Sequence, residues 1–171
     1  MNKKILFLDL EDTVIDDFSN MNLKNIEKVK SWIKKECFDE VRLFSFAIHY
    51  DACIKKFNTY LKHVLEDQLE IKINDDIFCT YYQYRAIGKY YMEYIEHDEL
   101  FDVIGKKRAF IAWCNINYSG NHCVLLDDAF KDETIIQYNN FTLIDFVLIK
   151  DGIDIRNVNN VSQYIESGFN L

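Results

Sequence analysis

Short apolar runs that end in acidic residues dominate the layout of this chain. The run ILFL leads into Asp9, Glu11 and Asp12, and the run VLL leads into Asp127 and Asp128. Short apolar runs without polar alternation are typical of strands buried on both faces, as in parallel sheets. Like charges at a strand end repel one another, so these acids lie either in a solvated turn or around a cation.

Strand and helix patterns alternate along the chain, which is typical of an α/β domain with a mainly parallel central sheet. Ligands lie at the carboxyl ends of the strands in such sheets, so we expect the two acidic clusters to meet in space. Glu133 is interpreted as an acid at a helix start. Strands are expected at residues 3–10, 41–47, 122–130 and 141–150, with one strand or two short ones at 69–79, and helices at 22–36, 50–66, 106–115 and 160–167.

Length and charge limit the organisation and the partners of the chain. Its 171 residues fit a single domain, residues 1–171, without an evident linker or repeat. The net charge of −8 disfavours broad binding to nucleic acid but allows a small phosphorylated substrate held by a few cations. The first residues are charged and no apolar run reaches the length of a membrane span, so we expect a soluble, cytoplasmic protein without a membrane partner. The heavy use of residues with AT-rich codons is typical of phages and low-GC bacteria.

The five cysteines and four histidines are scattered, without a C-x-x-C pair or other zinc-ligand spacing. An odd number of cysteines without an evident signal peptide favours free thiols in a reducing compartment. We therefore expect packed or surface positions for these side chains rather than a zinc site.

Four motifs, ILFLDLEDT, VRLFSFA, GKKRAF and HCVLLDD, follow one another along the chain. From residue 5 to about 132, the chain thereby resembles the haloacid-dehalogenase-like (HAD) hydrolases. The resemblance implies a three-layer, Rossmann-like α/β fold with at most a small cap, for which residues 80–104 are the candidate segment. It also implies a Mg²⁺-dependent phosphatase that hydrolyses a small phosphomonoester, such as a nucleotide, through an aspartyl-phosphate intermediate.

The resemblance assigns a role to each motif. Asp9 would be the nucleophile, because a carboxylate is already ionised at neutral pH. Ser45 would bind the phosphoryl group that is transferred. Lys106 or Lys107 would offset the negative charge, with Lys106 slightly favoured because it directly follows Gly105 at an expected helix start.

The resemblance also implies a Mg²⁺ site, built from the oxygen ligands that this ion prefers. The ligands would be the carboxylates of Asp9 and Asp127 and the backbone carbonyl of Glu11. A second acid after the fourth motif would be either Asp128 or Asp132, and the sequence does not choose between them.

Glu11 stands where the family usually has an aspartate that acts as the general acid. Its carboxyl group is one methylene farther from the backbone, and a displacement of about 1 Å can lower a rate by roughly a hundredfold. The alternatives to an ordinary phosphatase are therefore a slow or inactive HAD-like binding or regulatory protein and a polynucleotide end phosphatase.

A tyrosine-rich segment, residues 81–94, lies between the expected third strand and the lysines. Its aromatic rings either stack on a nucleotide base as part of a lid, or form an ordinary helix face that packs on the sheet. We favour the packed helix face.

Overall fold

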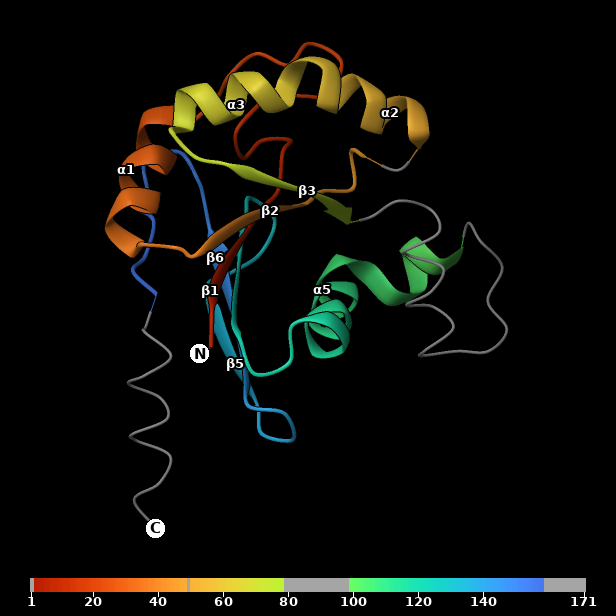
Figure 1. Cartoon of the computed structure of the whole chain (residues 1–171), viewed down its shortest axis with the longest axis vertical. Coiled ribbons are helices and arrows are strands. Elements are labelled where there is room, and N and C mark those ends of the chain that lie inside the picture. Colours follow the sequence, from red (N-terminus) through yellow and green to blue (C-terminus); the bar gives the residue numbers. More distant parts are fainter. Residues whose placement is uncertain (1, 49, 79–98, 159–171) are drawn as a thin grey trace.

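The computed structural model describes residues 2–48, 50–78 and 99–158, which build a six-stranded sheet with helices against it (Figure 1). The strand order is β3-β2-β1-β4-β6-β5. The strands are β1 (Lys4–Leu8), β2 (Glu40–Phe44), β3 (Ile73–Phe78), β4 (His122–Asp127), β5 (Glu133–Gln137) and β6 (Thr142–Leu148). The helices are α1 (Ile26–Glu36), α2 (Asp51–Lys56), the π-helical turn η1 (Phe57–Leu61), α3 (Lys62–Leu69) and α5 (Glu99–Asn117).

The sheet is mainly parallel, as the sequence predicts. Every neighbouring pair from β3 to β6 is parallel, and β5 pairs with β6 in the antiparallel direction. Strand β1 lies between β2 and β4, and Leu8 pairs with Leu43 on one side and with Leu126 on the other. The residues that follow these strands therefore share one edge of the sheet.

The apolar residues of the strands alternate between two cores, which makes the fold three-layered. Leu6 and Leu8 of β1 pack in one core with α1 and α3, while Ile5 and Phe7 pack in the other with α5. Figure 1 shows α1 and α3 on one side of the sheet and α5 on the other. Burial on both faces accounts for the continuous apolar runs in the sequence.

Phe110 anchors α5 to the sheet. Its ring contacts the rings of Phe7, Phe44 and Phe146 in edge-on geometry, at centroid distances of 5.1, 4.9 and 5.7 Å. Edge-to-face pairs of this kind stabilise a core beyond the area that they bury. Residues one helical turn before Phe110 are thus directed to the same side of the helix.

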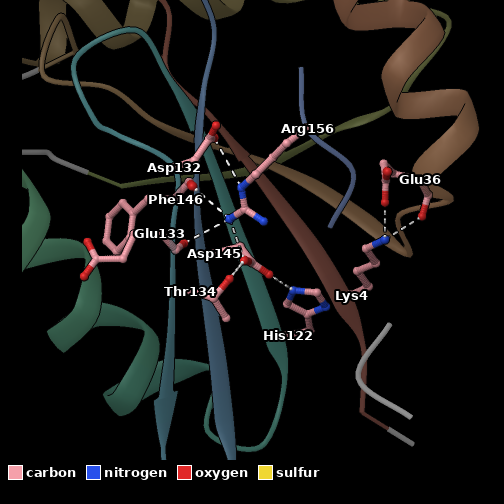
Figure 2. A network of polar contacts seen from close by, with 9 residues as sticks. All are labelled: Lys4, Glu36, His122, Asp132, Glu133, Thr134, Asp145, Phe146 and Arg156. Atoms are coloured by element: carbon pink, nitrogen blue, oxygen red, sulfur yellow. Dashed lines mark hydrogen bonds and ion pairs between the residues drawn. The ribbon is translucent and has the colours of Figure 1, made fainter. Parts of the chain in front are cut away.

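A buried polar network joins β4, β5 and β6 to the segment that follows β6 (Figure 2). Asp145 Oδ2 lies 2.6 Å from His122 Nε2, and Asp145 Oδ1 accepts hydrogen bonds from Thr134 and, at 2.6 Å, from Arg156 Nη2. Arg156 also donates to Asp132 Oδ1 at 3.2 Å. Arg156 thereby holds the chain after β6 against the sheet.

Several expected elements differ from the observed ones in their bounds. The helix expected at 22–36 begins only at Ile26, because Asn25 has a left-handed backbone conformation that precedes the helix. Leu23 is 41% exposed and lies in an isolated bridge with Ile15, so it is not part of the buried helix face. The segment 69–79 forms one strand, β3, rather than two.

The interpretation of Glu133 as a helix-start acid is wrong, because Glu133 is the first residue of β5. The helix expected at 106–115 is part of the longer α5, and the helix expected at 50–66 corresponds to α2, η1 and α3. The expected helix at 160–167 and the tyrosine-rich segment 81–94 lie outside the described residues. Among the described helices, none is long and apolar enough to cross a membrane.

Candidate functional site

The acidic ends of β1 and β4 meet, as predicted from the parallel sheet. The backbone N–H of Asp9 donates to the carbonyl of Leu126 at 3.1 Å, which continues the β1–β4 ladder by one residue. Asp9, Asp127 and Asp128 each offer a carboxylate oxygen within 4.8 Å of the others. These three residues, called the carboxylate cluster below, come from two distant parts of the sequence.

Lys106 bridges the two strand ends. Its Nζ atom lies 2.7 Å from Asp9 Oδ1 and 2.5 Å from Asp127 Oδ2. Lys106 precedes Phe110 by one helical turn, so the aromatic anchor of α5 directs the lysine toward the sheet. Gly105 has φ 69° and ψ 157°, a backbone conformation that favours glycine, and the regular helix that carries Lys106 begins after it.

Burial sets the electrostatics of the cluster. Asp9 is 4% exposed, and burial raises its pKa from 3.8 to about 6, although the ammonium of Lys106 acts in the opposite direction. The neighbouring charge of Asp127 raises the pKa of Asp9 further. Burial and Asp127 likewise raise the pKa of Asp128. Burial would lower the pKa of Lys106, but the two carboxylates outweigh it and raise that pKa.

The donor set fits a hard divalent cation. Asp127 is fully buried, and its Oδ2 atom, although close to Lys106, has no partner in hydrogen-bond geometry within the described part of the chain. Its other oxygen accepts the backbone N–H of Ala129 at 2.8 Å, which fixes the carboxylate plane. A cluster of three carboxylates that offers only oxygen ligands suits Mg²⁺. Asp9, Asp127 and Asp128 would hold the ion.

Ser45 and Thr13 lie beside Asp9. Ser45 follows β2, is buried, and its hydroxyl lowers the pKa of Asp9. Thr13 is also buried, and its Oγ1 donates to Asp9 Oδ2 at 3.5 Å. The sequence reasoning did not include Thr13 in the site, and its spacing of four residues after Asp9 is the signal that could have indicated it.

The side chain of Glu11 is engaged in the loop after β1. Its Oε1 atom accepts the backbone N–H of Phe18 at 2.9 Å. The next acid, Asp12, pairs with Lys24 at 2.7 Å. Both acidic side chains that closely follow Asp9 therefore have partners within this part of the chain.

The structure does not bring Lys107 and Asp132 into the cluster. Lys107 pairs with Glu133 at the start of β5, because it lies a third of a helical turn around from Lys106. Asp132 accepts the backbone N–H of Leu148 at 2.9 Å and pairs with Arg156. Of the alternatives left open by the sequence, Asp128 lies in the carboxylate cluster and Lys106 of α5 contacts it.

Comparisons with known proteins leave the family open. No protein-family model matches the chain, and no solved structure matches it significantly. A stretch of 52 residues is 40% identical to the ribosomal RNA large subunit methyltransferase K/L of Photobacterium profundum. This stretch is 30% of the present chain and 7% of that protein, so the chain corresponds to a small part of that relative.

Proposed function

We propose that this protein has a HAD-type fold and is a Mg²⁺-dependent phosphatase that forms an aspartyl-phosphate on Asp9. The observation that carries the proposal is the contact of one ammonium group, Lys106 Nζ, with both Asp9 and Asp127 at the ends of adjacent parallel strands. The partial likeness to a methyltransferase concerns 7% of that enzyme and supports no methyl transfer here.

Asp9 suits the role of nucleophile. Its carboxylate would attack phosphorus, and the P–O bond to the leaving group would break with its electron pair on the leaving oxygen. The hydroxyl groups of Thr13 and Ser45 both interact with the carboxylate, which limits the orientations that it can take. Such positioning is a large part of catalysis when both reactants are bound.

Lys106 suits the role of a fixed counter-charge. Its ammonium group offsets the negative charge of Asp9 and of an arriving phosphoryl group, and its burial strengthens that interaction relative to water. A bound Mg²⁺ would supply further charge neutralisation at the carboxylate cluster, so that an anionic nucleophile could approach an anionic phosphate. Ser45 would donate its hydroxyl to a phosphoryl oxygen.

The matched pair Lys106→Met and Lys107→Met tests the proposal. We expect the wild type to release phosphate from 4-nitrophenyl phosphate with Mg²⁺ and to lose this activity in EDTA. Lys106→Met should lower kcat/KM by about a hundredfold or more, because a group aimed at the developing charge is lost. Lys107→Met should change it less than about threefold. Equal effects of the two substitutions, or release that EDTA does not affect, would contradict the proposal.

A second candidate is a catalytically weak or inactive binding protein on the same fold. The hydrogen bond between Glu11 and Phe18 favours it, because the side chain at the usual general-acid position is already engaged. This alternative predicts that Mg²⁺ and orthovanadate, a phosphate mimic, bind to the wild type while no phosphomonoester is turned over. Isothermal titration in parallel with the phosphatase assay separates the two.

A further inference from the structure

Phe18 is held through both of its backbone polar groups. Its N–H donates to Glu11 Oε1 at 2.9 Å, and its carbonyl accepts a hydrogen bond from Lys56 Nζ, also at 2.9 Å. The Lys56 ammonium lies 5.2 Å from the centroid of the Phe18 ring, within cation–π range. Residue 18 is thus held by the first residue of the loop that follows Leu10 and by the last residue of α2.

The loop around Phe18 is braced internally. Asp16 accepts hydrogen bonds from the backbone N–H of Asn22 at 2.9 Å and from its side-chain amide at 2.6 Å. Asp17 accepts the backbone N–H groups of Ser19 and Asn20. The first half of the loop is anchored by Val14 and Ile15, which are fully buried in the core. The outer residues, 16–22, depend on the contacts of Phe18 with Glu11 and Lys56 for their place.

We propose that Glu11 is a positioning residue that ties the outer part of this loop, residues 16–22, to the segment that directly follows Asp9, and that the substrate therefore carries its phosphoryl group on a weakly basic leaving group. This inference rests on the proposed phosphatase function. The contact with Phe18 needs an acceptor oxygen at the end of a chain of glutamate length. It does not need a negative charge, so glutamine can replace glutamate in it.

The consequence for the substrate follows from proton transfer. The carboxyl group of Glu11 is held at the Phe18 N–H and is not among the described carboxylates that gather with Asp9, and the carboxylate of Asp12 is paired with Lys24. The leaving oxygen then departs as an anion while the bond between phosphorus and Asp9 forms. Water next attacks phosphorus, the electron pair of the P–O bond returns to Asp9, and the proton of the water goes to solvent or to the released phosphate. This route suits phosphates of phenols and carboxylic acids and phosphoanhydrides, whereas alkyl esters lose the roughly 10²–10⁴-fold contribution of a general acid.

Amide hydrogen exchange at Phe18 tests the positioning role without reference to activity. The set comprises the wild type, Glu11→Gln, Glu11→Ala, Lys56→Met and the control Glu27→Gln, which removes an exposed charge on α1. Exchange at Phe18 should stay slow in Glu11→Gln and Glu27→Gln and should accelerate about fivefold or more in Glu11→Ala. Lys56→Met should also accelerate it. Equal exchange at Phe18 in Glu11→Ala and the wild type overturns the positioning role.

Leaving-group dependence tests the substrate class. Wild-type kcat/KM for 4-nitrophenyl phosphate and acetyl phosphate should exceed that for glycerol 3-phosphate by about a hundredfold or more, and Glu11→Gln should leave these ratios within about threefold. A selective loss of glycerol 3-phosphate hydrolysis in Glu11→Gln would identify a general acid and overturn the inference, as would equal wild-type rates for all three. If none of the three phosphate compounds is hydrolysed, both the proposed phosphatase function and the proposed substrate class are wrong. Hydrogen exchange at Phe18 still tests the positioning role of Glu11 in that case.

Discussion

Two buried aspartates of the same sheet, Asp9 and Asp145, have opposite electrostatic behaviour. Both side chains are nearly inaccessible, at 4% and 0% exposure. Burial raises the pKa of Asp9 to about 6. At Asp145 burial acts in the same direction, but hydrogen bonds from His122, Thr134 and Arg156 outweigh it and lower the pKa. At Asp9 the donors Lys106, Thr13 and Ser45 do not outweigh burial and the neighbouring charge of Asp127, and perturbed carboxyl groups of this kind are typical of functional sites.

The two aspartates also differ in their place along the strands. Asp145 lies within β6, where the sheet fixes its neighbours on every side, as the network in Figure 2 shows. Asp9 lies just beyond β1, where the chain leaves the ladder. Near Asp145, the buried polar atom without a hydrogen-bond partner among the described residues is His122 Nδ1. This nitrogen is an uncharged acceptor when the ring carries its proton on Nε2. In the carboxylate cluster the corresponding atom is Asp127 Oδ2, whose close neighbour is the ammonium group of Lys106 at 2.5 Å.

The largest expected effect is that of Asp9→Asn. If Asp9 is the nucleophile, this substitution should lower phosphate release by at least about 10³-fold, because the amide cannot form the acyl-phosphate. The measurement is kcat for 4-nitrophenyl phosphate at saturating Mg²⁺, with circular dichroism as the control for folding. Retention of more than a tenth of the wild-type rate would show that Asp9 is not the nucleophile.

Asp145→Asn should have the opposite effect: it should lower the free energy of unfolding and should not specifically lower phosphate release. Removing its charge weakens the hydrogen bonds from Arg156 and His122, while Arg156 keeps its pair with Asp132, so the free energy of unfolding should fall by about 1–3 kcal/mol. Urea unfolding of this variant beside Asp154→Asn, an exposed aspartate on the same segment as Arg156, measures the difference. Comparable stability of the two variants would mean that the network is not structural.

The pH dependence of stability should have opposite signs at the two sites. Because the folded-state pKa of Asp9 is raised from 3.8 to about 6, the folded protein binds more protons than the unfolded chain between these values. Stability from Asp9 is therefore present below pH 3.8 and is lost as the pH rises through 6, by about 3 kcal/mol. Stability from Asp145 is present above its unfolded pKa and is lost as the pH falls through its lowered folded pKa.

Urea unfolding in EDTA from pH 4 to 7 measures the contribution of Asp9. The difference between the wild type and Asp9→Asn isolates it, and the wild type should lose stability relative to the variant across this range. Parallel curves would contradict the raised pKa of Asp9.

The smallest expected effect is stabilisation by Mg²⁺. An ion that binds only the folded state raises the free energy of unfolding by about 1.4 kcal/mol at ten times its Kd. The increment should be lost in Asp127→Asn and retained in Asp132→Asn, whose carboxylate pairs with Arg156 outside the cluster. Thermal unfolding with and without Mg²⁺ gives both increments, and loss of the increment in Asp132→Asn alone would assign the ion to a different site.

The sequence predicted the meeting of the strand ends because parallel pairing leaves little freedom once two apolar runs are buried. It did not separate Lys106 from Lys107, since adjacent helical residues differ only in direction, and that direction depends on the packing of Phe110. It likewise did not separate Asp128 from Asp132, because the turn after β4 determines which carboxylate returns to the cluster.

Strand β5 and the network around Asp145 were missed for different reasons. The segment ETIIQ is a short edge strand that depends on pairing with β6, so its own pattern is weak. Asp145 was visible as a lone acid within the apolar run TLIDFVL, a pattern that indicates a buried ion pair. Its partner Arg156 could not be identified from the sequence, because the contact depends on how the chain folds back after β6.

The hydrogen bond between Asp9 and the carbonyl of Leu126 has a consequence for how this protein can change over time. The distance between the two acidic strand ends is set by the β1–β4 ladder, which this hydrogen bond extends, rather than by the chain that connects the strands. Segments inserted between β2 and α5 could therefore grow, shrink or be exchanged while the reactive centre kept its geometry. Among related proteins, we expect insertions and deletions in the segments around the carboxylate cluster. The distance between the ends of β1 and β4 should change least.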